Sequence, residues 1–139
     1  MRFNTQAAQN NFEPVQLPHG THKIKWFISD GCGNESVCEY TIIVRDCKPP
    51  TVVCLNNLSV NIMPTGMIQM WAADFLQYAE DNCTLTPFLQ YGIRKCGQGS
   101  GFPLDGNGQP VSNVTFTCDE TGLQCIELWA IDLAGNADY

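Results

Sequence analysis

The sequence GTHKIKWFISDGCGN at residues 20–34 returns as GLQCIELWAIDLAGN at residues 122–136. Both stretches begin with glycine, carry isoleucine at their fifth position and end in Asp-x-x-Gly-Asn. The offset is 102 residues at every matched position (132 − 30 for the aspartates). An immunoglobulin-like β-sandwich has about 100 residues, so the offset predicts a tandem repeat of whole domains.

The first copy continues into a strand pattern. Tyr40, Ile42 and Val44 stand at every second position, which is the spacing of one face of a β-strand. Glycine and asparagine tolerate positive φ, so Asp-x-x-Gly-Asn between two such strands predicts a hairpin turn. We therefore interpret residues 1–46 as the C-terminal part of one immunoglobulin-like repeat. Residues 47–50, which include two prolines, are interpreted as a stiff linker.

Residues 51–139 are interpreted as a second repeat that lacks its final strand. The copy at 122–136 supplies the penultimate strand and the turn, and we expect the closing strand either from neighbouring sequence or, by strand donation, from another chain. Further strands are expected near residues 51–54, 58–63, 67–71, 87–94, 112–118 and 123–131, with one or two short helical turns near 72–79.

The composition indicates an all-β protein of an oxidising compartment. Charged residues make up 15% of the chain, well below the usual quarter, and this balance favours a β-sandwich over a helical bundle. Eight cysteines without a single Cys-x-x-Cys pair indicate disulfides rather than a zinc site. The predicted fold class is an all-β, immunoglobulin-like β-sandwich repeat stapled by disulfides.

Charge and hydropathy argue against two classes of partner. The net charge is −7, and the seven lysines and arginines are scattered singly, whereas nucleic-acid binding needs a basic stripe. No apolar run reaches the roughly 20 residues of a membrane span. The first residues contain no apolar secretion signal, so we expect the export signal of this secreted protein to lie outside the segment.

Four motifs in fixed order resemble a known family. They are Asp30–Asn34 followed by Cys38, the junction 46–50, the triplet Val52–Cys54, and the run Asp81–Thr84. Together they resemble the hyalin-repeat immunoglobulin-type domains, which form tandem arrays in secreted and gliding-motility-associated surface adhesins of Bacteroidetes. The resemblance covers residues 18–139. It implies a β-sandwich, export by a Bacteroidetes-type route, and an adhesive or stalk role without catalytic residues.

The cysteines depart from the simple family pattern. Ala134 replaces the turn cysteine Cys32 in the second copy, and Cys96, Cys118 and Cys125 are additions. The predicted bonds join Cys32 with Cys38 across the hairpin turn, Cys96 with Cys125 because both are additions, Cys83 with Cys118 within the domain, and Cys47 with Cys54 around the two prolines. The alternative is that Cys38 or Cys54 pairs outside the segment. Each bond would contribute a few kcal/mol.

Calcium is the one ligand that the sequence suggests. Acidic and amide side chains cluster where loops between domains are expected to meet, and the candidate ligands are Asp46, Asp81, Asn82, Asp132 and Asn136. Calcium takes 6–8 oxygen ligands, which carboxylates and backbone carbonyls of such loops can supply. The competing interpretation is that Asp30 and Asp132 only cap their turns by accepting hydrogen bonds from nearby amides. No other cofactor is expected.

The sequence predicts a structural protein rather than an enzyme. It contains no Gly-x-Ser-x-Gly elbow, no phosphate-binding loop and no His-Glu-x-x-His zinc motif. We expect a structural or adhesive repeat module of a large secreted cell-surface protein or filament. Its partners would be neighbouring repeats, other copies in a fibre, or surface glycans and proteins. The alternatives are a filament subunit that exchanges strands, and a carbohydrate-binding module that uses Trp26, Trp71 and Trp129.

Overall fold

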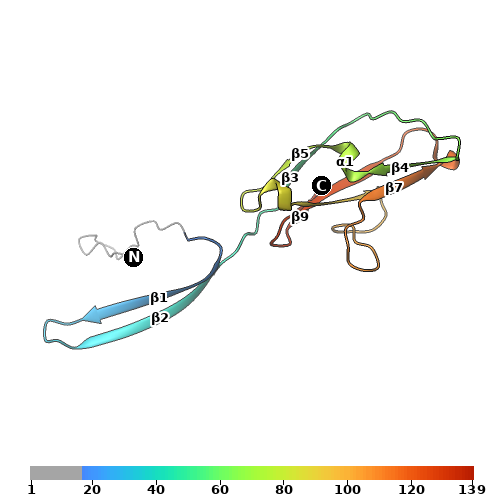
Figure 1. Cartoon of the computed structure of the whole chain (residues 1–139). Coiled ribbons are helices and arrows are strands. Elements are labelled where there is room, and N and C mark those ends of the chain that lie inside the picture. Colours follow the sequence, from blue (N-terminus) through green and yellow to red (C-terminus); the bar gives the residue numbers. More distant parts are fainter. Residues whose placement is uncertain (1–16) are drawn as a thin grey trace. The chain divides into compact units, whose positions relative to one another are not determined.

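The chain consists of two compact units in a computed structural model that describes residues 17–139. One unit ends at Asp46 and the other begins at Cys47 (Figure 1). Residues 1–16, with which the predicted first repeat starts, lie outside the described residues. Each unit is described by itself.

The first unit is a two-stranded antiparallel hairpin. Its strands are β1 (Gly20–Ser29) and β2 (Glu35–Val44), paired from Gly20 opposite Val44 to Ser29 opposite Glu35. Because side chains alternate across a strand, one face carries Ile24, Trp26, Ile28, Tyr40 and Ile42, and the other carries Lys23, Lys25 and Glu39 together with Phe27, Val37 and Ile43. The Nζ atoms of both lysines lie 3.0–3.1 Å from the Glu39 carboxylate.

The second unit contains three antiparallel sheets. In the first, β3 (Thr51–Cys54) pairs with β5 (Leu76–Glu80), and in the second, β4 (Met67–Trp71) pairs with β7 (Asn113–Thr117). In the third, β8 (Ile126–Ile131) lies between β6 (Gln90–Lys95) and β9 (Ala137–Asp138). The helical elements are single turns: α1 (Ala72–Phe75), η1 (Thr86–Phe88) and η2 (Cys118–Glu120). The prediction of an all-β, disulfide-stapled fold is therefore confirmed.

The core of the second unit lies between these sheets. Every second side chain of the central strands points inward, and the buried cluster comprises Met70, Ala72, Phe75, Ile93, Val114, Phe116 and Leu128. Ile93 is fully enclosed and Leu128 is 2% exposed. Burying each large side chain stabilises the fold by about 1.5–3 kcal/mol, so the β6–β8 pair anchors this unit.

The prediction of one or two short helical turns near 72–79 is confirmed by the single turn Ala72–Phe75, after which the chain becomes β5 at Leu76 and Leu76 pairs with Cys54. One local prediction is wrong. The expected strand at 58–63 does not form. Asn57 has a φ of 59°, a left-handed conformation that interrupts an extended chain, and no described strand pairs with this segment.

The two repeat copies fold into hairpins of identical register. In the first unit Ser29 pairs with Glu35 and Ile28 with Ser36. In the second unit Ile131 pairs with Ala137 and Ala130 with Asp138. Each of the four residues in the second ladder lies 102 positions after its counterpart (131 − 29, 137 − 35). The two residues of β9, Ala137 and Asp138, are therefore the equivalents of Glu35 and Ser36, the first two residues of β2.

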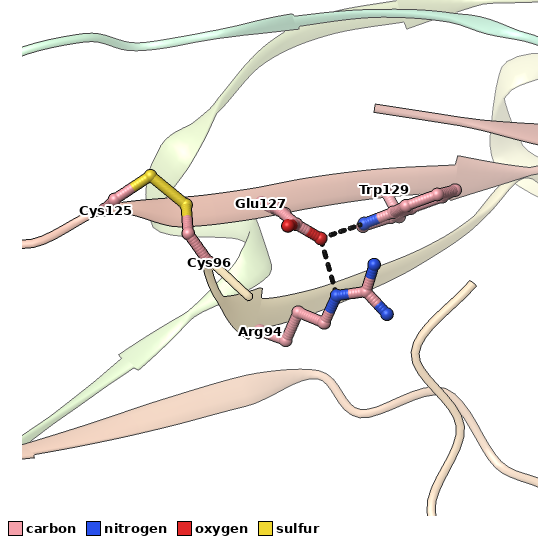
Figure 2. The surroundings of a disulfide bond; sticks show 5 residues. All are labelled: Arg94, Cys96, Cys125, Glu127 and Trp129. Carbon is pink, nitrogen blue, oxygen red and sulfur yellow. Dashed lines mark hydrogen bonds and ion pairs between the residues drawn. A yellow bond between two sulfur atoms is a disulfide. The ribbon is translucent and has the colours of Figure 1, made fainter. Parts of the chain in front are cut away.

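The disulfide predicted between Cys96 and Cys125 is confirmed (Figure 2). Cys96 follows the last residue of β6 and Cys125 precedes the first residue of β8, so the bond extends their ladder by one rung. The Cys96 amide donates to the Cys125 carbonyl over 3.1 Å. The Cα atoms lie 5.4 Å apart, within the usual range for a disulfide.

The predicted bond between Cys32 and Cys38 does not form. Cys38 lies within β2, opposite Trp26, and is three residues beyond Glu35, the end of the ladder. At about 3.3 Å per residue, this places it roughly 10 Å along the hairpin from the turn that holds Cys32. A disulfide needs Cα atoms closer than about 7 Å.

Two further predicted bonds are also wrong. Cys83 adjoins Thr84, which contacts Leu133 just beyond the C-terminal end of β8. Cys118 begins η2, and Glu120 of that turn pairs with Lys95. Lys95 lies opposite Ile126, at the N-terminal end of β8. The six residues of β8 separate those ends by about 16 Å. Cys47 and Cys54 do not pair because the chain between them makes no turn and enters β3 extended.

We predict that the Cys96–Cys125 disulfide is a major source of stability in the second unit. The cross-link closes a loop of 29 residues, for which the loss of chain entropy in the unfolded state predicts about 3.6 kcal/mol. The double variant Cys96→Ser/Cys125→Ser should lose about that much free energy of unfolding in urea denaturation.

The control is Cys118→Ser, because Cys118 is exposed and its Sγ donates only to the Gly66 carbonyl over 3.5 Å. A serine hydroxyl can keep that hydrogen bond, so this variant should match the parent chain. Equal stability of the double variant and the control would contradict the prediction.

Candidate functional site

The hairpin turn at Asp132 is held by its own aspartate. The Asp132 amide donates to the Asn136 carbonyl over 3.0 Å, and the Gly135 amide donates to the Asp132 carbonyl over 3.4 Å. The side chain accepts from the Asn136 amide at Oδ1 and from Asn136 Nδ2 at Oδ2, both over 2.8 Å. Gly135 has a φ of 90°, which glycine adopts without a steric cost. This geometry supports the predicted role of Asp132 as a turn cap.

The same turn recurs at two other places. Asp30 makes the corresponding bonds to Asn34, and Gly33 again has a φ of 90°. In the loop after β6, Asp105 Oδ1 accepts from the Asn107 and Gln109 amides over 2.8 Å. This glycine-rich loop thus contains the same Asp-x-x-Gly turn. Its sequence signal, aspartate with glycine three residues later, recurs as 105–108.

A second acidic bend lies beside the Asp132 turn. Asp81 Oδ2 accepts from the amides of Cys83 and Thr84 over 2.8 and 2.6 Å. The hydroxyl of Thr84, a buried residue, accepts from the Leu133 amide over 3.3 Å, so the bend and the turn are joined directly. One carboxylate oxygen of Asp81 and one of Asp132 lie within 4.8 Å of each other.

This bend and this turn bring two of the five predicted calcium ligands together. Asp132 is 6% exposed, and Asp81 Oδ1 is buried without a hydrogen-bond partner. Asn136 directs its Nδ2 group to Asp132, and Asn82 directs its Nδ2 group to Cys83 Sγ over 2.9 Å. Asp46 is the last residue of the first unit, and its role as a ligand stays a prediction.

The pair of carboxylates fits calcium in kind but is not a complete ligand set. Two oxygens at the usual 2.3–2.6 Å from one ion would lie no more than about 5 Å apart, which agrees with the separation of Asp81 and Asp132. Calcium needs 6–8 oxygens, so backbone carbonyls and water would have to supply most of them.

A small cleft opens beside the Asp81 bend. It has a volume of about 210 Å³ and is lined by Lys48, Pro49, Thr51, Glu80, Asp81 and Asn82. Its walls are the residues leading into β3 and those leaving β5, two strands that pair in the ladder where Thr51 lies opposite Glu80. The lining holds two carboxylates and one ammonium group, and carboxylate oxygens are ligands that a cation such as calcium takes.

The outer face of the β6–β8 pair carries a network that the sequence did not predict. Arg94 Nε lies 2.5 Å from Glu127 Oε2, and Trp129 Nε1 donates to the same oxygen over 3.1 Å (Figure 2). The Arg94 guanidinium lies 5.0 Å from the centre of the Trp129 ring, and Tyr139 stacks on that ring at 4.5 Å. The indole N–H, and after it the guanidinium, lower the pKa of Glu127 from its ordinary value of 4.5.

The tryptophans do not form the exposed row that sugar stacking would need. Trp129 is 8% exposed and lies between Arg94 and Tyr139. Trp71 is 49% exposed at the end of β4, and Trp26 belongs to the first unit. A single half-exposed indole in the second unit does not favour the carbohydrate-binding alternative.

Comparison with protein-family models, with curated proteins and with solved structures found no match. Within the described residues, no helix is long and apolar enough to cross a membrane.

We predict an acid-sensitive contribution to stability from Glu127. Because its pKa is lower in the folded chain, the contribution is complete above the unfolded value of about 4.5 and is lost as the pH falls through the folded value. The urea midpoint of the parent chain should therefore fall as the pH is lowered below about 4.5. Glu127→Gln should show a shallower fall over the same interval.

Asp119→Asn is the matched control, since Asp119 is exposed on η2 and removing its charge alters no contact of the Arg94–Glu127 network. It should retain the steep fall of the parent chain. If Glu127→Gln also retains it, the network does not contribute to the acid response.

Proposed function

We propose that this chain is a structural and adhesive repeat module of a large secreted protein displayed at the cell surface. In this function the first unit is the closing hairpin of one repeat and the second unit is the body of the next. Its partners are neighbouring repeats of the same protein, and its mechanism is mechanical: rigid, disulfide-stapled sandwiches hold an adhesive surface away from the cell.

The observation that carries the proposal is the unequal burial of equivalent residues in the two hairpins. Leu128 and Ala130 point into the core of the second unit and are 2% and 0% exposed. Their counterparts 102 positions earlier are Trp26, which is half-buried, and Ile28, which is 63% exposed. Residues at equivalent positions of the two hairpins thus face a core in the second unit but not in the first.

The apolar face of the first hairpin therefore has the chemistry of a core face. Besides Trp26 and Ile28 it carries Tyr40, which is 56% exposed opposite Ile24, and Ile42. A two-stranded hairpin is marginally stable in water by itself, and an apolar patch of this kind marks an interaction surface. We infer that the other strands of the same sandwich cover it in the native protein, with inner faces like those of β4 and β7.

The sequence motifs support the same function. The hyalin-repeat resemblance rests on the turn at Asp30–Asn34, the junction 46–50 and the run Asp81–Thr84. The turn forms a strand-connecting hairpin and the run forms a tight bend. The Cys96–Cys125 disulfide agrees with an oxidising compartment, and hence with an extracellular location.

Calcium binding at Asp81 and Asp132 is a further part of the proposal. The two carboxylates would hold the ion at the end of the sandwich where the Asp132 turn and the Asp81 bend meet. An ion there would neutralise two buried negative charges and fix the bend relative to the turn.

We predict that the protein is displayed outside the cell. Antibodies raised against residues 47–139 should label intact, unpermeabilised cells of the source organism, and the native antigen should run far above 15.4 kDa on a non-reducing gel. Deletion of the coding segment should reduce attachment of the cells to a surface. Labelling that appears only after permeabilisation would overturn the proposed function.

We predict that calcium stabilises the second unit. Extracellular modules bind calcium with a Kd of roughly 0.1–1 mM, so calcium at about ten times that concentration should raise the thermal midpoint by about 5 °C. Asp81→Asn should abolish this rise, and Asp119→Asn, which changes the net charge equally, should leave it intact. An equal response to magnesium, or no response to calcium, would contradict the prediction.

A further inference from the structure

A long groove crosses the second unit beside the segment that leads into β8. It has a volume of about 900 Å³ and its two walls are the segment Leu55–Ile62 and the segment Glu120–Ile126. Its floor is the hydrophobic core itself, through Met70, Phe75 and Phe116. Apolar side chains also stand along the groove, with Leu58 46% exposed and Leu123 98% exposed.

The groove reaches Ile126, the first residue of β8. On the edge of β8 opposite β6, only Ala130 and Ile131 have a partner among residues 17–139, the strand β9. From Trp129 back to Gly122, the same side pairs with no described strand. A sheet edge of this kind presents unpaired amides and carbonyls that pair readily with an added strand.

The first unit shows what fills the equivalent place. There β1 is a strand from Gly20 to Ser29 and is paired along its whole length with β2. The equivalents of Gly20–Lys23 are the residues Gly122–Cys125, which line the groove and are not in a strand. They have the same position in the repeat, but no described strand pairs with them.

The matching register specifies the pattern of the missing partner. In the first unit Cys38, Tyr40 and Ile42 lie on the same face as Trp26 and Ile24, whose counterparts Leu128 and Ile126 line the core or the groove. A strand with this pattern would place its alternate apolar side chains over the exposed floor. Its other residues would face solvent, as Glu39 and Thr41 do.

We propose that this groove is a binding site for an extended strand, supplied by a polypeptide segment of the same repeat type. The strand runs antiparallel to residues 122–129, continues the ladder begun by β9, and fills the groove with alternate apolar side chains in the pattern of β2. This inference rests on the proposed repeat function and adds its partner: each module receives one strand through this site.

The test uses the purified 139-residue chain and a fluorescent peptide. The peptide carries Cys38–Asp46 of this sequence with Cys38→Ser, so that binding is non-covalent, and it begins after the three residues whose equivalents, 137–139, the chain already holds. The expected result is saturable 1:1 binding by anisotropy. Amide exchange should slow within residues 122–129 and remain unchanged in β4 and β7.

Two matched peptides test the pattern without disturbing the fold of the protein. Tyr40→Asp places a carboxylate on the side that faces the floor and should weaken binding about tenfold or more. Thr41→Asp places the same charge on the solvent side and should change the affinity by less than about threefold.

Equal weakening by the two substitutions, or saturable binding without protection of residues 122–129, would overturn the proposal, as would no binding. If surface labelling succeeds and the peptide fails, the repeat function stands and the strand site falls. If the peptide binds and labelling fails, the strand site stands and the surface location falls.

Discussion

One side-chain interaction sets the geometry of both hairpins. In each copy an aspartate accepts two bonds from an asparagine four residues later, while the glycine between them takes a positive φ. Because a hairpin turn fixes the strand register, this local arrangement determines which residues of the following strand face the core. The register is the same in both units, although Asp30 is exposed and Asp132 is buried. The hydrogen bonds of the turn therefore form whether the aspartate is exposed or buried.

The register has opposite consequences for burial in the two units. In the second unit it delivers Leu128 to a core that also receives Ile93 from β6, and the Cys96–Cys125 bond extends that same ladder. In the first unit it displays an apolar face that no other described element of the unit covers. An apolar face of fixed register is a specific surface, because a slip of one residue would replace it with the opposite face, where Lys23, Lys25 and Glu39 stand among apolar residues. The two hairpins thus share a turn and a register but differ in whether described residues of their own unit cover the equivalent face.

The sequence predicted what local patterns encode. The Asp-x-x-Gly-Asn motif sufficed for both hairpins, and alternation sufficed for β2. The strands expected near 51–54 and 67–71 form as β3 and β4, and the additional cysteines pointed to the disulfide between Cys96 and Cys125. It failed where a partner far along the chain decides the outcome. Residues 58–63 have a strand-like composition but lie beyond Asn57, in the left-handed region, and have no described partner. The Cys83–Cys118 prediction failed because loop ends of the sandwich cannot be assigned from spacing alone.

Part of the candidate site was predicted from the sequence and part was not. Asp81 and Asp132 were chosen as loop residues expected to meet, and they do approach each other through Thr84 and Leu133. The Arg94–Glu127–Trp129 network was not predicted, because its first two members are 33 residues apart and become neighbours only through the β6–β8 register. Its only local signal is the i, i+2 spacing of Glu127 and Trp129, which places both side chains on one face of a strand.

The most direct test of the account is amide hydrogen exchange of residues 20–44, measured in the native protein and in the isolated 139-residue chain. If the first hairpin closes a sandwich, its amides should exchange in the native protein as slowly as those of β6 and β8. In the isolated chain they should exchange orders of magnitude faster, as expected for a two-stranded hairpin. Rapid exchange of β1 and β2 in both samples would contradict the account, because it would mean that the apolar face of this hairpin is never covered.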